Sequence, residues 1–250
     1  MNSHPDLNPA GPAGVSLLSV NSIHVARGEI DVLRDVSLDV KQGQFVAILG
    51  ANGGGKTTLL RALSGLLPTH AGDMLFDGQS LLGKKPHDIA RAGLVHVPEG
   101  RGVLGEQTVW ENLKLGMAYH GWRGRTEELE RVYNWFPILR TRGSATAGML
   151  SGGEQQMLSI ARSLLCRPKM LMIDELSLGL APKITRELMT FLRTISRTGF
   201  TVLIVEQNAH LALEFADHIY VIAQGRVVLS GAAGSLAQES SLLDAYLGQA

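Results

Sequence analysis

The sequence predicts an α/β fold with a mainly parallel sheet, an N-terminal antiparallel β layer and an inserted helical subdomain. Short apolar runs alternate with helical patterns along most of the chain. Residues 15–40 alternate in character on either side of a glycine turn, and residues 109–166 have helical periodicity. At 250 residues, the chain is long enough for one such domain with a substantial buried core.

The first part of the chain contains five strand-like segments. These are residues 15–25, 33–40, 45–49, 73–76 and 94–97. The first two flank a turn near Gly28, which predicts antiparallel pairing, whereas the third is apolar throughout and predicts a strand buried on both faces. A helix is expected after the third strand, ending near Pro68, and another is expected to begin at Pro86.

The second part begins with the helical subdomain, expected over about 109–166. Its region contains Trp110, Trp122 and Trp135, which we expect to pack in the core or at an interface. The α/β pattern then resumes, with expected strands at 170–173, 201–205 and 219–223 and expected helices at 182–198 and 209–215. Strands that alternate with helices predict a mainly parallel sheet covered on both faces.

Composition indicates a neutral protein of a reducing compartment. Lysine plus arginine and aspartate plus glutamate both number 23, so no overall basic field attracts nucleic acid. The single Cys166 cannot form an internal disulfide and is expected to pack as a small hydrophobe. Residues 1–14 are expected to be a disordered leader, without the features of a secretory signal, before one domain over 15–250. The apolar runs are strand-sized, so any membrane association requires another protein.

A glycine-rich loop between the third strand and the following helix predicts a phosphate site. The loop consists of Gly50, Ala51, Asn52, Gly53, Gly54, Gly55, Lys56 and Thr57, and Thr58 follows at the same site. Glycines let backbone N–H groups turn toward an anion, and the helix adds its positive end. Lys56 is expected to reach the β and γ phosphates and Thr57 to ligate Mg²⁺. This loop alone does not distinguish between kinases, GTPases, helicases and other nucleotide-binding proteins.

Two carboxylates follow the apolar strand at 170–173. Carboxylates at a strand end are costly unless they serve a cation or catalysis. Asp174 is expected to hold magnesium directly or through water, and Glu175 is expected to orient or deprotonate the attacking water.

A third motif, residues 150–156, has the sequence Leu-Ser-Gly-Gly-Glu-Gln-Gln. Ser151 and Glu154 have capping-box spacing, which accounts for a helix start. Two consecutive glycines, Gly152 and Gly153, weaken a helix and instead offer N–H groups to an anion, so we favour an anion-binding role.

Together these three segments resemble an ATP-binding cassette (ABC) ATPase. The resemblance implies that Glu175 is the catalytic base and that ATP and Mg²⁺ are the cofactors. It also implies that Ser151 and Gly153 contact the γ-phosphate of ATP held by a facing subunit, so a second cassette, identical or different, is required.

Residues 97–101, 108–113, 177–182 and 205–210 extend the likeness to the ATP-binding subunits of branched-chain amino-acid importers. The likeness covers nearly all of the chain after about residue 17, and cassettes for urea, amides and aromatic acids share much of it. It implies permease subunits that dock near residues 99–107, a periplasmic or extracellular solute-binding protein, and a location at the cytoplasmic face of the membrane.

Several residues depart from the general cassette pattern. Glu99 stands where most members have a glutamine that contacts magnesium, and Gln207 stands where a histidine usually contacts the γ-phosphate. Arg27 stands where most cassettes have an aromatic ring near the base. Its guanidinium can stack on adenine, and an exposed arginine at a strand end is an equally good interpretation. Leu176 replaces a proline, a change without a functional account from the sequence.

Three functions fit these motifs. The first is an ATPase that powers an importer. The second is a regulatory cassette in which Glu99 and Gln207 leave a site with little turnover, against which the retained Lys56, Asp174 and Glu175 argue. A soluble cassette of translation or DNA repair is disfavoured, because such proteins carry tandem cassettes or long insertions.

Overall fold

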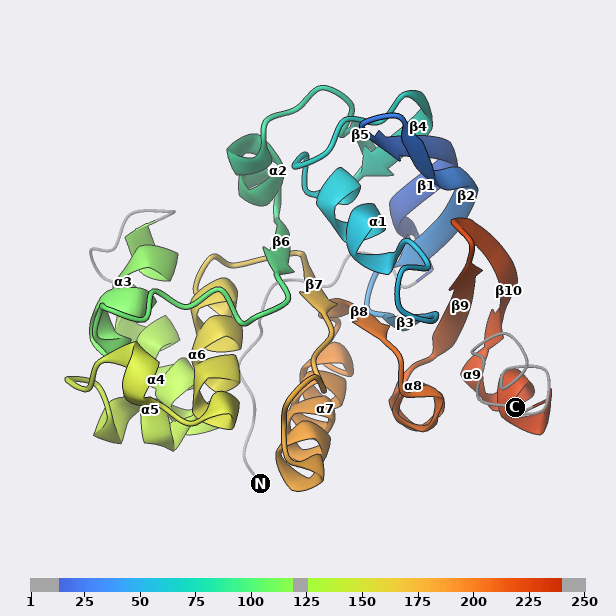
Figure 1. The fold of residues 1–250 in the computed structure, drawn as a ribbon. Helices are drawn as coiled ribbons and strands as arrows, with labels where there is room; N and C mark the ends of the chain where they lie inside the picture. Colours follow the sequence, from blue (N-terminus) through green and yellow to red (C-terminus); the bar gives the residue numbers. More distant parts are fainter. Residues whose placement is uncertain (1–13, 119–125, 240–250) are drawn as a thin grey trace.

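The structure is a computed structural model that describes residues 14–118 and 126–239, and it contains two sheets (Figure 1). The smaller sheet is antiparallel, with the strand order β2-β1-β4-β5. Its strands are β1 (Ser16–Arg27), β2 (Ile30–Lys41), β4 (Ala71–Phe76) and β5 (Gln79–Ser80). The turn around Gly28 joins β1 to β2, so the predicted N-terminal antiparallel layer is confirmed.

The larger sheet has the order β10-β9-β3-β8-β7-β6 and is parallel except for the β9–β10 pair. Its strands are β3 (Phe45–Leu49), β6 (Leu94–Val97), β7 (Met170–Asp174), β8 (Thr201–Glu206), β9 (His218–Ala223) and β10 (Arg226–Ala232). Every residue of β3 and β7 is buried, as expected for strands covered on both faces. The predicted α/β fold with a mainly parallel sheet is confirmed.

Helices cover both faces of this sheet and create two cores. Alternate residues of β3 point into different cores: Phe45, Ala47 and Leu49 into one, Val46 and Ile48 into the other. The second core lies between the large sheet, α1 and the antiparallel sheet, whereas the first lies toward the later helices. The helices are α1 (Lys56–Leu63), α2 (Pro86–Ala92), α3 (Val109–Ala118), α4 (Thr126–Trp135), α5 (Pro137–Thr141), α6 (Gly152–Leu164), α7 (Pro182–Ser196), α8 (Ala209–Phe215) and α9 (Ala233–Leu236).

The region predicted to be a helical subdomain holds α3 to α6, which gather on one side of the large sheet in Figure 1. The expected packing role of the tryptophans holds for Trp110 and Trp135, which are partly buried against the first core; the Trp135 ring lies 5.5 Å from that of Phe191. Cys166 packs against the same core, as expected. Trp122 and residues 1–13 of the predicted leader lie outside the described residues.

Strand β10 was not among the predicted elements. Its burial alternates between exposed and half-buried, since it lies at the edge of the sheet and has only β9 as a partner. A half-buried edge strand has a weak apolar signal, which explains why it was missed. Within the described residues, no helix has the length and apolar character needed to cross a membrane.

Candidate active site

The glycine-rich loop connects β3 to α1 and depends on glycine at several points. Gly53 and Gly55 have φ angles of 78° and 107°, in the left-handed region. A Cβ atom on Gly50 would lie 2.3 Å from the carbonyl oxygen of Ile222 in β9. The loop therefore needs both glycine's backbone freedom and its lack of a side chain, which is what a close backbone cradle requires.

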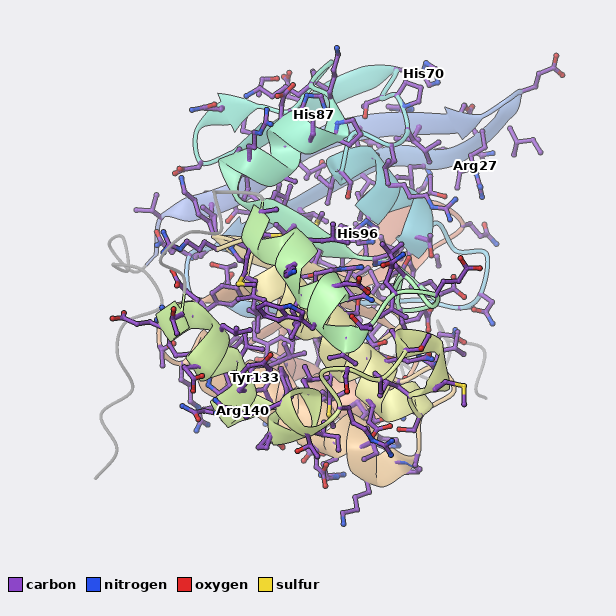
Figure 2. The ribbon with its side chains drawn as sticks, turned by 90° about the vertical axis from the view of Figure 1, so that its left-hand side faces the viewer. Arg27, His70, His87, His96, Tyr133 and Arg140 are labelled. Atoms are coloured by element: carbon purple, nitrogen blue, oxygen red, sulfur yellow. The ribbon has the colours of Figure 1, made fainter. Side chains whose placement is uncertain are left out.

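A cavity of about 620 Å³ opens over this loop, and we call it the loop cavity. It brings together residues of the predicted site that come from five separate segments. Its lining consists of Arg27, Val32, Asn52, Gly53, Gly55, Lys56, Thr57, Thr58, Arg61, Glu99, Glu175, Leu178 and Gln207. Arg27, labelled in Figure 2 at the end of β1, lines this cavity with an exposed side chain.

Lys56 is buried and points back into the loop. Its Nζ donates to the carbonyl oxygens of Gly50 at 2.7 Å and Ala51 at 3.1 Å, and it forms an ion pair with Glu175 Oε1 at 3.2 Å. Only 4% of the lysine side chain and 8% of the Glu175 side chain are exposed, so the two charges compensate each other with little help from water. A phosphate that entered the cavity would compete with Glu175 for this cation.

Glu175 is held by contacts on both sides of its carboxylate. Gln207 Nε2 donates to Glu175 Oε2 at 3.0 Å, whereas Lys56 contacts the other carboxylate oxygen. The backbone N–H of Glu175 donates to the carbonyl oxygen of Val205 at 3.0 Å. Its φ of 52° is in the left-handed region, which is uncommon for a residue other than glycine and is typical of residues whose position is constrained by function. Glu175 therefore sits in a fixed position over the loop cavity.

Thr57 and Asp174 form a second pair at the same end of the sheet. Thr57 Oγ1 donates to Asp174 Oδ1 at 3.2 Å, whereas the buried Oδ2 has no hydrogen-bond partner. Burial raises the pKa of Asp174 to about 6, with further upward contributions from Glu175 and Glu99, against the lowering effects of Thr57 and Lys56. A bound cation would satisfy the free oxygen and reverse this shift.

This donor set fits magnesium. A hydroxyl and a carboxylate are the hard oxygen ligands that Mg²⁺ prefers, and the free Oδ2 is available for it. Glu99 lines the same cavity as Thr57, so the carboxylate at the usual glutamine position is within the site. Mg²⁺ usually keeps several waters and binds through one or two carboxylates together with substrate phosphates, which agrees with so few protein ligands.

Sequence reasoning missed Glu206, the last residue of β8. It is fully buried and accepts hydrogen bonds from Ser177 N at 2.9 Å and Ser177 Oγ at 2.7 Å. Burial raises its pKa, and the Ser177 bonds act in the opposite direction. Glu206 thus holds the loop after Glu175, and Leu176 anchors the same loop because its side chain is 1% exposed in the first core. The apolar residue after Glu175 therefore has a packing role.

The 150–156 motif begins α6, and none of the described residues that line the loop cavity belongs to it. Ser151 and Glu154 form a reciprocal capping box: Glu154 N donates to Ser151 Oγ at 3.3 Å, and Ser151 N donates to Glu154 Oε2 at 2.7 Å. Ser151 is exposed, so its capping contact leaves one side open to solvent.

Both glycines of this motif also have close neighbours in their own chain. A Cβ on Gly153 would lie 2.8 Å from Ile184, and one on Gly152 would lie 2.7 Å from the end of the flexible Arg101 side chain. Packing thus contributes to the requirement for glycine at 153, beside the anion-binding role expected from the sequence. The predicted contact with a facing nucleotide stays a prediction.

Comparison with known proteins agrees with this site. The family model described as "ABC transporter" matches residues 33–177. The chain is 41% identical over 232 residues to the high-affinity branched-chain amino acid transport ATP-binding protein BraG of Pseudomonas aeruginosa, covering 93% of this chain and all of BraG. It is 33% identical to the probable branched-chain amino acid transport ATP-binding protein LivF of Archaeoglobus fulgidus, over 88% of this chain and 94% of LivF.

A solved structure has the same fold. The ADP conformation of MJ1267, an ATP-binding cassette of an ABC transporter, superposes with a TM-score of 0.79 at 27% identity, over 94% of this chain and 99% of that one. The family match spans more than half of the chain and includes both the glycine loop and the Asp174–Glu175 pair. The chain belongs to the ABC transporter family, as one of its ATP-binding cassettes.

Proposed function

We propose that this cassette binds MgATP in the loop cavity and hydrolyses it to power an importer of branched-chain amino acids. The observation that carries the proposal is the convergence of Lys56, Glu175 and Gln207 beside the Thr57–Asp174 pair in one cavity. The substrate class comes from the relatives, whose names state branched-chain amino acid transport.

In this mechanism the phosphate chain of ATP lies along the N–H groups of residues 50–55 at the positive end of α1. Lys56 leaves the Gly50 and Ala51 carbonyls to contact the β and γ phosphates, and Thr58 contributes from the first turn of α1. Arg27 stacks on the adenine from β1. Contact with phosphate would thus replace the Lys56 bonds to these two carbonyls.

Once Lys56 has moved to phosphate, the Glu175 carboxylate is free to take a proton from the attacking water. Gln207 keeps the carboxylate oriented through its Nε2 and, as a neutral donor, also reaches toward the γ-phosphate. Thr57, Asp174 and Glu99 would hold magnesium, which supplies charge neutralisation at the β and γ phosphates.

A second cassette completes the proposed catalytic unit. Exposed Ser151, with Gly152 and Gly153, would face the nucleotide of the partner cassette, and Met149 beside them is 84% exposed. Permease subunits would dock near residues 99–107 and hold the cassette at the cytoplasmic face of the membrane, and a solute-binding protein would deliver the amino acid to them.

The test uses the assembled transporter in proteoliposomes, with its solute-binding protein outside and ATP inside. We expect uptake of labelled leucine, isoleucine or valine that requires ATP and is lost in Lys56→Ala. If only urea, amides or other organic solutes compete for uptake, the substrate class is wrong.

A second experiment tests hydrolysis at this site. The partner cassette's catalytic glutamate is replaced, so that turnover reports only on the loop cavity described above. If the partner proves to be a second copy of this chain, mixed dimers with one tagged Glu175→Gln copy serve the same purpose. Residual ATP hydrolysis is expected, and its complete absence would favour a regulatory cassette.

A further inference from the structure

Four buried side-chain atoms among the described residues have no hydrogen-bond partner: His96 Nε2, Asp174 Oδ2, Ser159 Oγ and Ser196 Oγ. The first two belong to residues that line one cavity of about 510 Å³, which we call the β6 cavity. Its lining consists of Arg61, Leu66, Leu67, His96, Pro98, Glu99, Gly100 and Asp174. Figure 2 shows His96 well inside the outline of the molecule, in contrast to His70 and His87 near its edge.

Hydrogen bonding favours one tautomer of His96. With the Ser64 hydroxyl hydrogen on the Leu60 carbonyl at 2.7 Å, the 3.0 Å contact between Ser64 Oγ and His96 Nδ1 has Nδ1–H as its donor. Burial, with a smaller contribution from Arg61, lowers the pKa of His96 to about 4, so the ring is neutral near pH 7. Its Nε2 therefore presents a lone pair that accepts a hydrogen bond.

The strand register places His96 and Asp174 on one face of the sheet. His96 pairs with Met172 in the parallel β6–β7 ladder, and Asp174 lies two residues beyond Met172. Alternate residues of a strand share a face, and this face is the one that α1 covers with Ser64 and Thr57. His96 and the Thr57–Asp174 pair thus face the same side of the sheet.

Two acceptors cannot satisfy each other, and neither atom has a hydrogen-bond partner among the described residues. Water is small enough for the β6 cavity and can donate to two acceptors at once. Magnesium dehydrates reluctantly and usually keeps several waters when it binds a protein. Waters around a cation at Thr57 and Asp174 would therefore supply the donors that His96 Nε2 and the carboxylate lack.

We propose that His96 is a positioning residue of the magnesium site, whose Nε2 accepts a hydrogen bond from water in the outer shell of the cation held by Thr57 and Asp174. The inference rests on the proposed function, because it assumes that this pair holds magnesium. The proposal adds His96 on β6 to the two residues already assigned to the magnesium site, Asp174 on β7 and Thr57 on α1. Outer-shell partners of this kind orient the ligands and change metal affinity about 10- to 100-fold when removed.

The test titrates the full chain, saturated with a non-hydrolysable ATP analogue, with Mn²⁺ and follows free Mn²⁺ by electron paramagnetic resonance. His96→Phe should weaken Mn²⁺ binding about tenfold. His96→Gln, whose amide oxygen can still accept, should retain most of the affinity. His70→Phe is the matched control, because His70 is exposed and lines neither the loop cavity nor the β6 cavity.

A second variant leaves the histidine in place and covers the case in which His96→Phe fails to fold. Ser64→Ala removes the acceptor for Nδ1–H, so the proton can move to Nε2 and convert the acceptor into a donor. Its Mn²⁺ affinity should fall, with thermal unfolding of the nucleotide-free protein reporting separately on stability.

Three results would overturn the inference. If Asp174→Asn loses Mn²⁺ binding but His96→Phe and Ser64→Ala do not, His96 plays no part, while the magnesium site of the proposed function stands. If His96→Phe and His96→Gln weaken binding equally, the role of His96 is packing. If Asp174→Asn also binds Mn²⁺ normally, the proposed magnesium site falls with the inference.

Discussion

Replacing Glu175 with glutamine should change ATP binding and ATP hydrolysis in opposite directions. Glu175 Oε1 lies 3.2 Å from Lys56 Nζ and would compete with phosphate for this cation. A hydrogen bond to a charged group contributes about 1.5 to 3 kcal/mol. The neutral glutamine oxygen should keep roughly half of this energy in its contact with Lys56 Nζ. ATP affinity should therefore rise by about 1 kcal/mol, or roughly fivefold.

Hydrolysis should fall in the same variant, because an amide cannot accept the proton of the attacking water. Loss of a general base costs about 10²- to 10⁴-fold in kcat, which corresponds to roughly 3 to 5 kcal/mol of barrier. ATP affinity is measured by displacement of a fluorescent ATP analogue without magnesium, and kcat is measured in the assembled transporter.

A control separates the Lys56 contact from a general effect of charge. Glu99→Gln removes a negative charge from the same cavity, and the described contacts give Glu99 no bond to Lys56. Its ATP affinity should rise less than that of Glu175→Gln. Equal rises, or weaker binding in Glu175→Gln, would refute the competition between Glu175 and phosphate.

Three further predictions concern stability. Glu206→Ala leaves both Ser177 donors without their acceptor, so chemical denaturation should show that the free energy of unfolding falls by about 1 to 3 kcal/mol. Ser177→Ala loses only the hydroxyl bond and should lower it less. Equal losses would contradict the role of Glu206 in holding the Ser177 loop. Gly50→Ala places a Cβ 2.3 Å from a carbonyl oxygen of β9, so it should lower stability by about 1 to 3 kcal/mol and weaken ATP binding; normal binding would show that the loop relaxes freely. The net pKa of Asp217 is below its ordinary value of 3.8, because burial raises it but the Arg193 and backbone hydrogen bonds outweigh burial. The ionised Asp217 therefore stabilises the fold fully above its ordinary pKa, and this stabilisation is lost as pH falls through the lower pKa of the folded state. The difference in unfolding free energy between the unaltered protein and Asp217→Asn should thus shrink below about pH 4. It should not change near pH 6.

Much of the site could be predicted because its parts are contiguous. The glycine loop lies between one buried strand and one helix, so residues 50–57 meet at a strand end in any α/β fold. Asp174 and Glu175 end a fully apolar strand, and parallel strands share the edge at which they end. The cavity that joins Lys56, Thr57 and Glu175 follows from these two facts.

Other contacts depend on packing between segments that no local pattern connects. Glu206 and Ser177 are 29 residues apart, and His96 and Ser64 are 32 apart. Each of these side chains is unremarkable within its own segment, and the edge strand β10 is only half-buried. The close neighbour of Gly153, Ile184, likewise lies on another helix.

The sequence by itself determined the fold class, the phosphate loop, the two carboxylates and the family, because short-range spacing fixes which groups share one turn or one strand end. Only the tertiary structure decided that Lys56 is paired with Glu175, that Glu206 holds the loop after Glu175, and that His96 and Asp174 face the same side of the sheet. These contacts arise from the strand register and from packing against α1, which bring distant residues to within hydrogen-bonding distance.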